Sequence, residues 1–230
     1  MKKITLFFSI LSFLSCSENQ VRLQLSVIPE ISVTDFEFKD GGLMDTVVLT
    51  FKYQDGDANL GFDYSEDKPN PWIYLKDNNN QFILLGSSDT LPGYDCFNWK
   101  TGEAIEYWEG YDIENLATSD TVLVEPNPKF FNFEIDFYTV IDNTRSQIDL
   151  TQNCYPGFDM RLYDFNKMSE NPAIIEYFPK SEFQGEVVCK FISMGWTFIA
   201  DNKPIIANFL IKDNDDNHSN IAETEEILIP

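Results

Sequence analysis

The feature that most constrains the fold is an alternation of apolar and polar residues with a period of two. In segment 45–54, "DTVVLTFKYQ", one face carries Val47, Leu49, Phe51 and Tyr53. Segments 129–140 and 205–213 repeat this alternation. Successive side chains of a β-strand point to opposite faces, so these segments are predicted to be strands with one buried and one solvated face.

Segment 129–140 shows the two faces most clearly. The predicted buried face consists of Phe131, Phe133, Ile135 and Phe137, and the predicted solvated face of Asn132, Glu134 and Asp136. Further short strand-like segments follow one another, separated by turn clusters such as DGG, DNNN and DNDDN. We therefore expect an all-β fold, an immunoglobulin-like antiparallel β-sandwich over residues 31–230, with an irregular insertion at 88–120.

The N-terminus has the pattern of an export signal. Two lysines precede an apolar run that is too short to span a bilayer permanently. The run ends in "FLSC", which resembles a bacterial lipobox. Residues 1–15 are therefore predicted to be a signal peptide, Cys16 the lipidated residue and residues 16–30 a tether. Phe13 stands where leucine is usual, which leaves ordinary signal-peptide cleavage as the alternative.

The charge of the chain excludes one class of partner. The 38 acidic and 16 basic residues give a net charge of −22, and removal of residues 1–15, with their two lysines, would make it −24. Such a surface repels nucleic acid and anionic lipid headgroups, so no nucleic-acid partner is expected. Hydrophobic residues make up 43% of the chain and aromatic residues 15%, enough for a packed core rather than a disordered chain. Membrane contact would depend on the lipid anchor.

Three cysteines follow Cys16. An odd number in an exported protein allows one disulfide and leaves one thiol. Cys189 lies in the apolar segment "EVVCKFI" and is predicted to be a small buried residue. Cys96 and Cys154 lie in polar, turn-rich segments and are predicted to form the disulfide.

Two loops carry a D-x-D-x-N array directly after a predicted strand. The arrays are Asp55, Asp57 and Asn59, and Asp213, Asp215 and Asn217. In an immunoglobulin-like sandwich both loops can lie at one end, where a Ca²⁺ ion would offset the repulsion between their carboxylates. We therefore predict a structural Ca²⁺ site. The alternative is a pair of plain acidic turns, because Asp and Asn also favour turns by bonding to nearby backbone. Leu60 stands where an EF-hand requires glycine, so an EF-hand is not expected.

Aromatic residues crowd the irregular insertion. The predicted ligand-binding set is Trp99, Tyr107, Trp108 and Tyr111. Exposed, these rings would stack on a glycan; the alternative is a small satellite core beneath the insertion. Trp72 and Trp196 lie in or beside apolar strand patterns and are predicted to belong to the core.

Catalytic chemistry has little support in the sequence. His218 is the only histidine and lies in a polar hairpin. Ser-His-Asp and Cys-His catalysis would both require it, and a zinc site without histidine would need clustered cysteines. A carboxylate pair of the kind that cleaves glycosides stays open among so many acids. The protein is predicted not to be an enzyme.

Three segments in order resemble a family of uncharacterised Gram-negative bacterial lipoproteins with an immunoglobulin-like fold. "DGDANLG" is similar to the family's D-G-D-G-D-I-G loop, departing at Ala58 and Asn59, and "NPKFFNFEIDFYTV" is similar to its N-P-x-x-N-N-I-x-V-D-F strand. The last segment resembles a D-R-A-x-N-K-S-N-x-x-E-T-P-E-I closing hairpin, with matches at Asp213, Asn217, Ser219, Asn220, Glu223 and Thr224.

The resemblance implies a lipid-anchored cell-envelope protein of the outer membrane, facing the periplasm or the cell surface. The predicted function is a non-catalytic interaction or scaffold role, with the membrane bound through the lipid anchor and a protein as partner. The alternative, suggested by the aromatic cluster, is a glycan-binding lipoprotein that accompanies outer-membrane nutrient porters.

Overall fold

The computed structural model describes residues 25–42, 44–62, 71–103, 116–149, 157–163, 175–181, 183–193 and 195–230. Several predictions concern residues outside these ranges, namely the signal peptide, Cys16, Tyr107, Trp108, Tyr111 and Cys154. Among the described residues, no helix is long and apolar enough to cross a bilayer.

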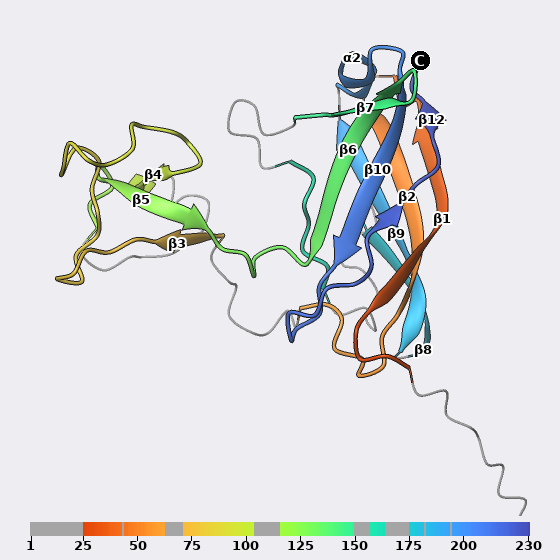
Figure 1. Cartoon of the computed structure of the whole chain (residues 1–230), viewed down its shortest axis with the longest axis horizontal. Helices are drawn as coiled ribbons and strands as arrows, with labels where there is room; N and C mark the ends of the chain where they lie inside the picture. Colours follow the sequence, from red (N-terminus) through yellow and green to blue (C-terminus); the bar gives the residue numbers. More distant parts are fainter. Residues whose placement is uncertain are drawn as a thin grey trace, which may run out of the picture.

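Two antiparallel sheets pack face to face (Figure 1). The first has the order β1-β2-β9-β8 and consists of β1 (Glu30–Lys39), β2 (Asp45–Gln54), β8 (Ile175–Ser181) and β9 (Gln184–Ser193). The second has the order β11-β10-β6-β7, with β12 also paired to β10, and consists of β6 (Phe133–Ile141), β7 (Thr144–Gln147), β10 (Pro204–Ile211), β11 (Ala222–Glu223) and β12 (Ile227–Leu228). A short helix, α2 (Trp196–Ala200), joins β9 to β10. The predicted all-β antiparallel sandwich is confirmed; its immunoglobulin-like type stays a prediction.

Aromatic side chains from both sheets form the centre of the core. Phe51 of β2 lies 5.1 Å from Phe209 of β10 and 5.9 Å from Phe133 of β6, measured between ring centroids. Phe137 and Trp196 continue the cluster, with their rings 5.0 Å apart. The alternating pattern in β2 therefore places its apolar face between the sheets, as predicted, and Trp196 is fully buried.

Asn132 departs from the alternation. The sequence places it on a solvated face, but it is buried at 2% exposure. Its side-chain amide donates to the carbonyl of Leu162 at 2.8 Å and accepts from the Leu162 N–H at 2.6 Å. The amide thus reproduces a backbone pairing, which satisfies two buried polar groups of the neighbouring segment. The expectation of a solvated Asn132 was wrong for this reason.

Asn220 makes the same kind of pairing at the edge of the first sheet. Its amide accepts from the Ile31 N–H at 2.9 Å and donates to the Ile31 carbonyl at 3.0 Å. Ile31 belongs to edge strand β1, whose unpaired backbone groups would otherwise offer a template for another strand. Asn220 therefore ties the closing segment of the chain to its first strand.

A small third sheet lies apart from the sandwich (Figure 1). It has the order β3-β5-β4 and consists of β3 (Trp72–Tyr74), β4 (Trp99–Thr101) and β5 (Thr121–Pro126). Its buried residues are Trp99, which shares a face with its partner Leu123, and Val122 and Val124, which lie on the other face. Trp72 is only partly buried, and the Lys100 ammonium lies 4.0 Å above its ring. The predicted insertion therefore belongs, in its described part, to a unit that extends beyond 88–120 on both sides.

The described cysteines differ in state. Cys189 is a free thiol, completely buried in β9, and burial raises its pKa. Cys96 is disulfide-bonded. Because Cys189 is free, the partner of Cys96 is one of the two cysteines outside the described residues, and pairing with Cys154 stays a prediction.

We predict that Phe133→Ala lowers the free energy of unfolding by about 3–5 kcal/mol, because it opens a cavity where three other phenylalanine rings meet. Phe198→Ala is the matched control, since that ring is 86% exposed, and it should change stability by less than about 0.5 kcal/mol. Urea unfolding followed by circular dichroism measures both. Equal losses in the two variants would contradict this account of the core.

Candidate metal centre

The two acidic loops meet at one end of the sandwich. Asp55 directly follows β2, and Asp213 lies two residues after β10. Both strands run toward the same end, the lower one in Figure 1. An antiparallel bridge joins Leu60 to Asp213, and Asn214 donates its side-chain amide to the carbonyl of Gly61 at 3.1 Å. The structure therefore brings together the two arrays that the sequence predicts to share an end.

Three carboxylates converge at this junction. One oxygen from each of Asp55, Asp57 and Asp213 lies within 4.8 Å of the other two. Asp55 and Asp213 are buried, at 1% and 5% exposure, whereas Asp57 is exposed. Asn59 donates its amide to Asp57 at 3.3 Å and to Asp215 at 3.0 Å, so Asp215 joins the cluster through Asn59.

Two oxygen atoms at the junction are buried without a hydrogen-bond partner. Asp55 Oδ2 accepts from the Asn59 N–H at 3.0 Å, but Asp55 Oδ1 has no partner, and neither has Asn59 Oδ1. A buried acceptor without a donor costs about 1–3 kcal/mol, and more when it is charged. Burial, contact with Asp57 and the charge of Asp213 all raise the pKa of Asp55. A bound cation would satisfy both oxygens and reverse the unfavourable charge balance.

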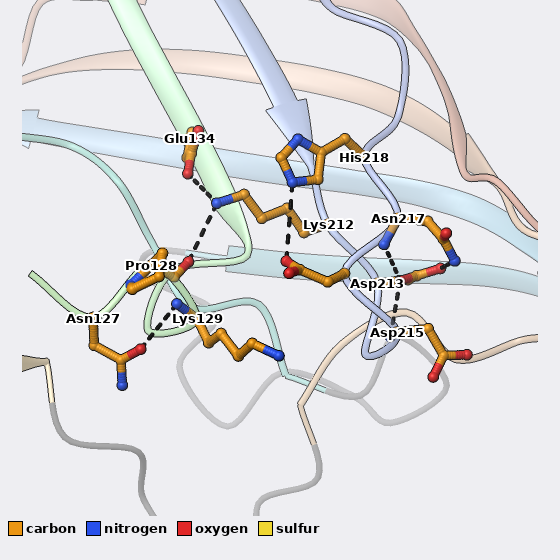
Figure 2. A network of polar contacts seen from close by, with 10 residues as sticks. Asn127, Pro128, Lys129, Glu134, Lys212, Asp213, Asp215, Asn217 and His218 are labelled. Carbon is orange, nitrogen blue, oxygen red and sulfur yellow. Dashed lines mark hydrogen bonds and ion pairs between the residues drawn. The ribbon is translucent and has the colours of Figure 1, made fainter. Parts of the chain in front are cut away.

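The second array serves mainly to shape its own turn. Asp213 accepts from the backbone N–H of Asp215 at 2.9 Å and of Asn217 at 2.7 Å, and from the Asn217 amide at 2.7 Å (Figure 2). The amide nitrogen of Asn217 is therefore bonded to Asp213 within the turn. The plain-turn alternative describes this loop, except that Asp213 itself also faces Asp55 and Asp57.

Ala58 sits where the resembled family has glycine. Its φ of 61° is in the left-handed region, which favours glycine because a Cβ atom is strained there. The loop thus keeps a glycine-like turn without a glycine. This turn sets Asp57 and Asn59 beside Asp55.

Basic residues near the junction are directed elsewhere. Lys212 is 7% exposed and pairs with Glu134, and it donates to the carbonyl of Pro128 at 3.3 Å (Figure 2). His218 is exposed, with its Nε2 3.9 Å from Asp216. Neither side chain is paired with Asp55, Asp57 or Asp213 among the described interactions.

The predicted aromatic platform is not supported at its described member. Trp99 is 1% exposed, and its indole N–H donates to the carbonyl of Gly93 at 3.0 Å. This ring is core to the small sheet and cannot stack on a glycan without unpacking, so the satellite-core alternative holds for Trp99. The other three aromatics of the set lie outside the described residues.

Comparison with known proteins gives no relative. No protein-family model matches the chain, no curated protein matches it, and no solved structure matches it.

Asp159 is a second perturbed carboxyl group, which no sequence spacing indicated. It accepts from the N–H of Ile135 in β6 at 3.0 Å. Burial, reinforced by the charges of Glu134 and Asp136, raises its pKa from 3.8 to about 6. Its proton is therefore held more tightly in the folded protein than in the unfolded chain.

We predict that Asp159 makes the protein less stable as pH rises from about 4 to about 6, because its ionisation is disfavoured only in the folded state. Asp159→Asn keeps a hydrogen-bond acceptor for the Ile135 N–H and removes this pH-dependent loss of stability. Urea unfolding should show the variant equal to wild type near pH 4 and more stable by about 1–2 kcal/mol near pH 7.5. Asp142→Asn, which removes an exposed charge in the β6–β7 turn, is the control. A stability difference independent of pH would contradict the assignment.

Proposed function

We propose that the protein is a lipid-anchored cell-envelope protein with a non-catalytic interaction or scaffold role, in which a structural Ca²⁺ ion holds one end of the sandwich. The observation that carries the calcium site is the buried Asp55 carboxylate, whose Oδ1 has no hydrogen-bond partner and which lies beside Asp57 of its own loop and Asp213 of the second loop.

The available ligands suit a hard cation. Asp55, Asp57 and Asp213 supply carboxylate oxygens, and Asn59 supplies its unpartnered amide oxygen. Calcium accepts six to eight oxygen ligands in flexible geometry, whereas magnesium demands a near-ideal octahedron. Carboxylates from two loops, each following a different strand, fit the flexible geometry of calcium better than the octahedron that magnesium demands.

The junction lies between the two sheets, so an ion bound there would link them. Asp55 ends a strand of the first sheet and Asp213 follows a strand of the second. A cation shared between them would cross-link the two layers at a place where their carboxylates otherwise repel. This supports a stabilising ion rather than a catalytic one.

The described titratable groups favour a non-catalytic role. His218 is exposed and lies beside a carboxylate in a turn. The Cys189 thiol is sealed in the core with a raised pKa, which opposes formation of the nucleophilic thiolate. Asp159 uses its carboxylate to accept from the backbone of β6.

The anchor would place the metal centre near the membrane. The N–H of Gly56 donates to the carbonyl of Ser26 at 2.7 Å, so the chain enters the sandwich beside the acidic junction (Figure 1). Lipid on Cys16 would then hold this end toward the bilayer and α2 away from it. The glycan-binding alternative required an exposed Trp99, and this side chain is buried.

For the cation, we predict that Ca²⁺ at about 100 times its dissociation constant raises the melting temperature by about 5–10 °C, and that chelator reverses the rise. Asp55→Asn should abolish most of this response, yet in chelator it should be at least as stable as wild type, because it removes a buried charge. Asp142→Asn, at the opposite end of the sandwich, should respond to Ca²⁺ as wild type does. Differential scanning calorimetry measures all three proteins. An unchanged wild-type melting temperature with and without Ca²⁺ would remove the metal centre.

For the anchor, we predict that the protein expressed in a Gram-negative host is recovered in the membrane fraction and that Cys16→Ser moves it to the soluble fraction. Mass spectrometry of the mature N-terminus should find a lipidated Cys16. A mature chain that begins elsewhere, or equal membrane recovery of the two proteins, would refute lipid anchoring.

A further inference from the structure

A polar cavity of about 200 Å³ opens on the first sheet near the end where the chain enters. The side chains around it are Glu30, Ser32, Lys52, Gln54, Lys180 and Gln184, and the buried residues Ile31, Tyr53 and Gly185 complete the lining. Among these residues the only acid is Glu30.

The strand register explains why these polar side chains gather. Glu30 pairs with Gln54, and Gln54 pairs with Gln184, so the three side chains form one row across β1, β2 and β9. Directly paired residues point to the same face of a sheet. Ser32, Lys52 and Glu186 form the next row on that face, two residues along, and of these Ser32 and Lys52 line the cavity. The intervening residues point into the core, which leaves the polar set on the outer face.

The buried wall of the cavity leaves no space for a side chain at Gly185. A Cβ atom at Gly185 would lie 2.7 Å from the hydroxyl oxygen of Tyr53 and 2.9 Å from the carbonyl of Phe178. Lys180 lies where the register of β8 shifts between Pro179 and Ser181. The bulge brings an ammonium group to the side of the cavity without a matching partner in the ladder.

The charged groups of Lys52 and Lys180 contact no acid, carbonyl oxygen or aromatic ring among the described residues, which is unusual in this protein. Most basic side chains of the described residues contact an acid, a carbonyl oxygen or an aromatic ring. Within the described ranges, those whose charged group makes no such contact are Lys52, Lys129 and Lys180. Two of these three line the same cavity.

The local charge favours an anion although the whole chain is acidic. Among the lining residues, two lysines stand against one glutamate in a protein of net charge −22, and Glu186, which pairs with Lys52 on the same face, lies outside the lining. Charges farther away than about 8 Å are largely screened at physiological salt, so the charged groups next to the cavity, and not the net charge of the chain, determine which ligand binds. A cationic ligand would find more favourable sites elsewhere on this surface.

Size and chemistry narrow the ligand further. Pockets for drug-sized ligands hold about 300–1,000 Å³, so a cavity of about 200 Å³ suits a ligand of one sugar ring. The amides and the hydroxyl group match a ligand rich in hydroxyl groups. We propose that this cavity binds a small hydroxylated anion, a single sugar residue that carries a carboxylate or a phosphate. The proposal rests on the non-catalytic binding role and does not require the metal centre.

Isothermal titration calorimetry tests this site with D-glucuronate, D-glucose 6-phosphate and neutral D-glucose, each in Ca²⁺ and in chelator. At least one charged probe should bind with a dissociation constant of about 1 mM or tighter, and D-glucose about ten-fold more weakly. Which charged probe binds distinguishes a carboxylate from a phosphate ligand. Because the cavity does not include Asp55 or Asp213, binding in chelator would persist even if the protein showed no response to Ca²⁺.

Lys52→Ala and Lys180→Ala should each weaken binding about ten-fold, since each removes a charge-assisted hydrogen bond. Lys129→Ala is the matched control. Its ammonium group also lacks such a contact, but it does not line the cavity, so the affinity should stay unchanged. All three side chains are exposed, so the variants should melt like wild type. The proposal is overturned if neither charged probe binds, if D-glucose binds equally well, or if the two cavity variants behave like Lys129→Ala.

Discussion

The contact between Phe51 and Phe209 is the constraint on which the acidic end of the molecule depends. The two rings, 5.1 Å apart, set β2 against β10 across the core, and both strands run toward the same end. Four residues beyond each ring the chain reaches Asp55 and Asp213, at equal distances from the shared contact. Packing between apolar faces therefore determines that two acidic loops, far apart in sequence, meet. The repulsion that results is a consequence of the core, which hydrophobic burial can outweigh because it involves far more surface.

Much of the sandwich could be predicted because its signal is local. Alternation in β2 identified the buried face residue by residue, and the expected sandwich, with an acidic array after each of two strands, led to the expectation that the two loops share an end. The sequence could not show which carboxylate would be buried. Asp55 and Asp57 look equivalent in the array, yet only Asp55 follows the strand directly and is covered, with one oxygen left unpaired. That distinction depends on the path of the second loop, which local patterns do not encode.

Polar residues were harder to place than apolar ones. Asn132 was expected on a solvated face but is buried, and the amides of Asn132 and Asn220 each pair with both backbone groups of a residue in another segment, Leu162 and Ile31 respectively. An asparagine can imitate a peptide group because it carries the same donor and acceptor, and its sequence neighbours do not reveal when it does so. Trp99 shows the reverse case, since an aromatic ring in a polar, turn-rich segment is buried by the small sheet. In all these cases, long-range pairing decided the environment.

The pairing of β1 with β2 has a mechanical consequence. The described chain begins beside the lower end of β1, whereas Pro230 lies at the upper end of the sandwich (Figure 1). Tension between these two points runs parallel to the strands. The β1–β2 ladder extends from Glu30 to Lys39, and its hydrogen bonds lie across that direction, so they would be sheared together instead of unzipped one after another. Such an arrangement resists detachment of the first strand most strongly along the axis on which a tether would pull.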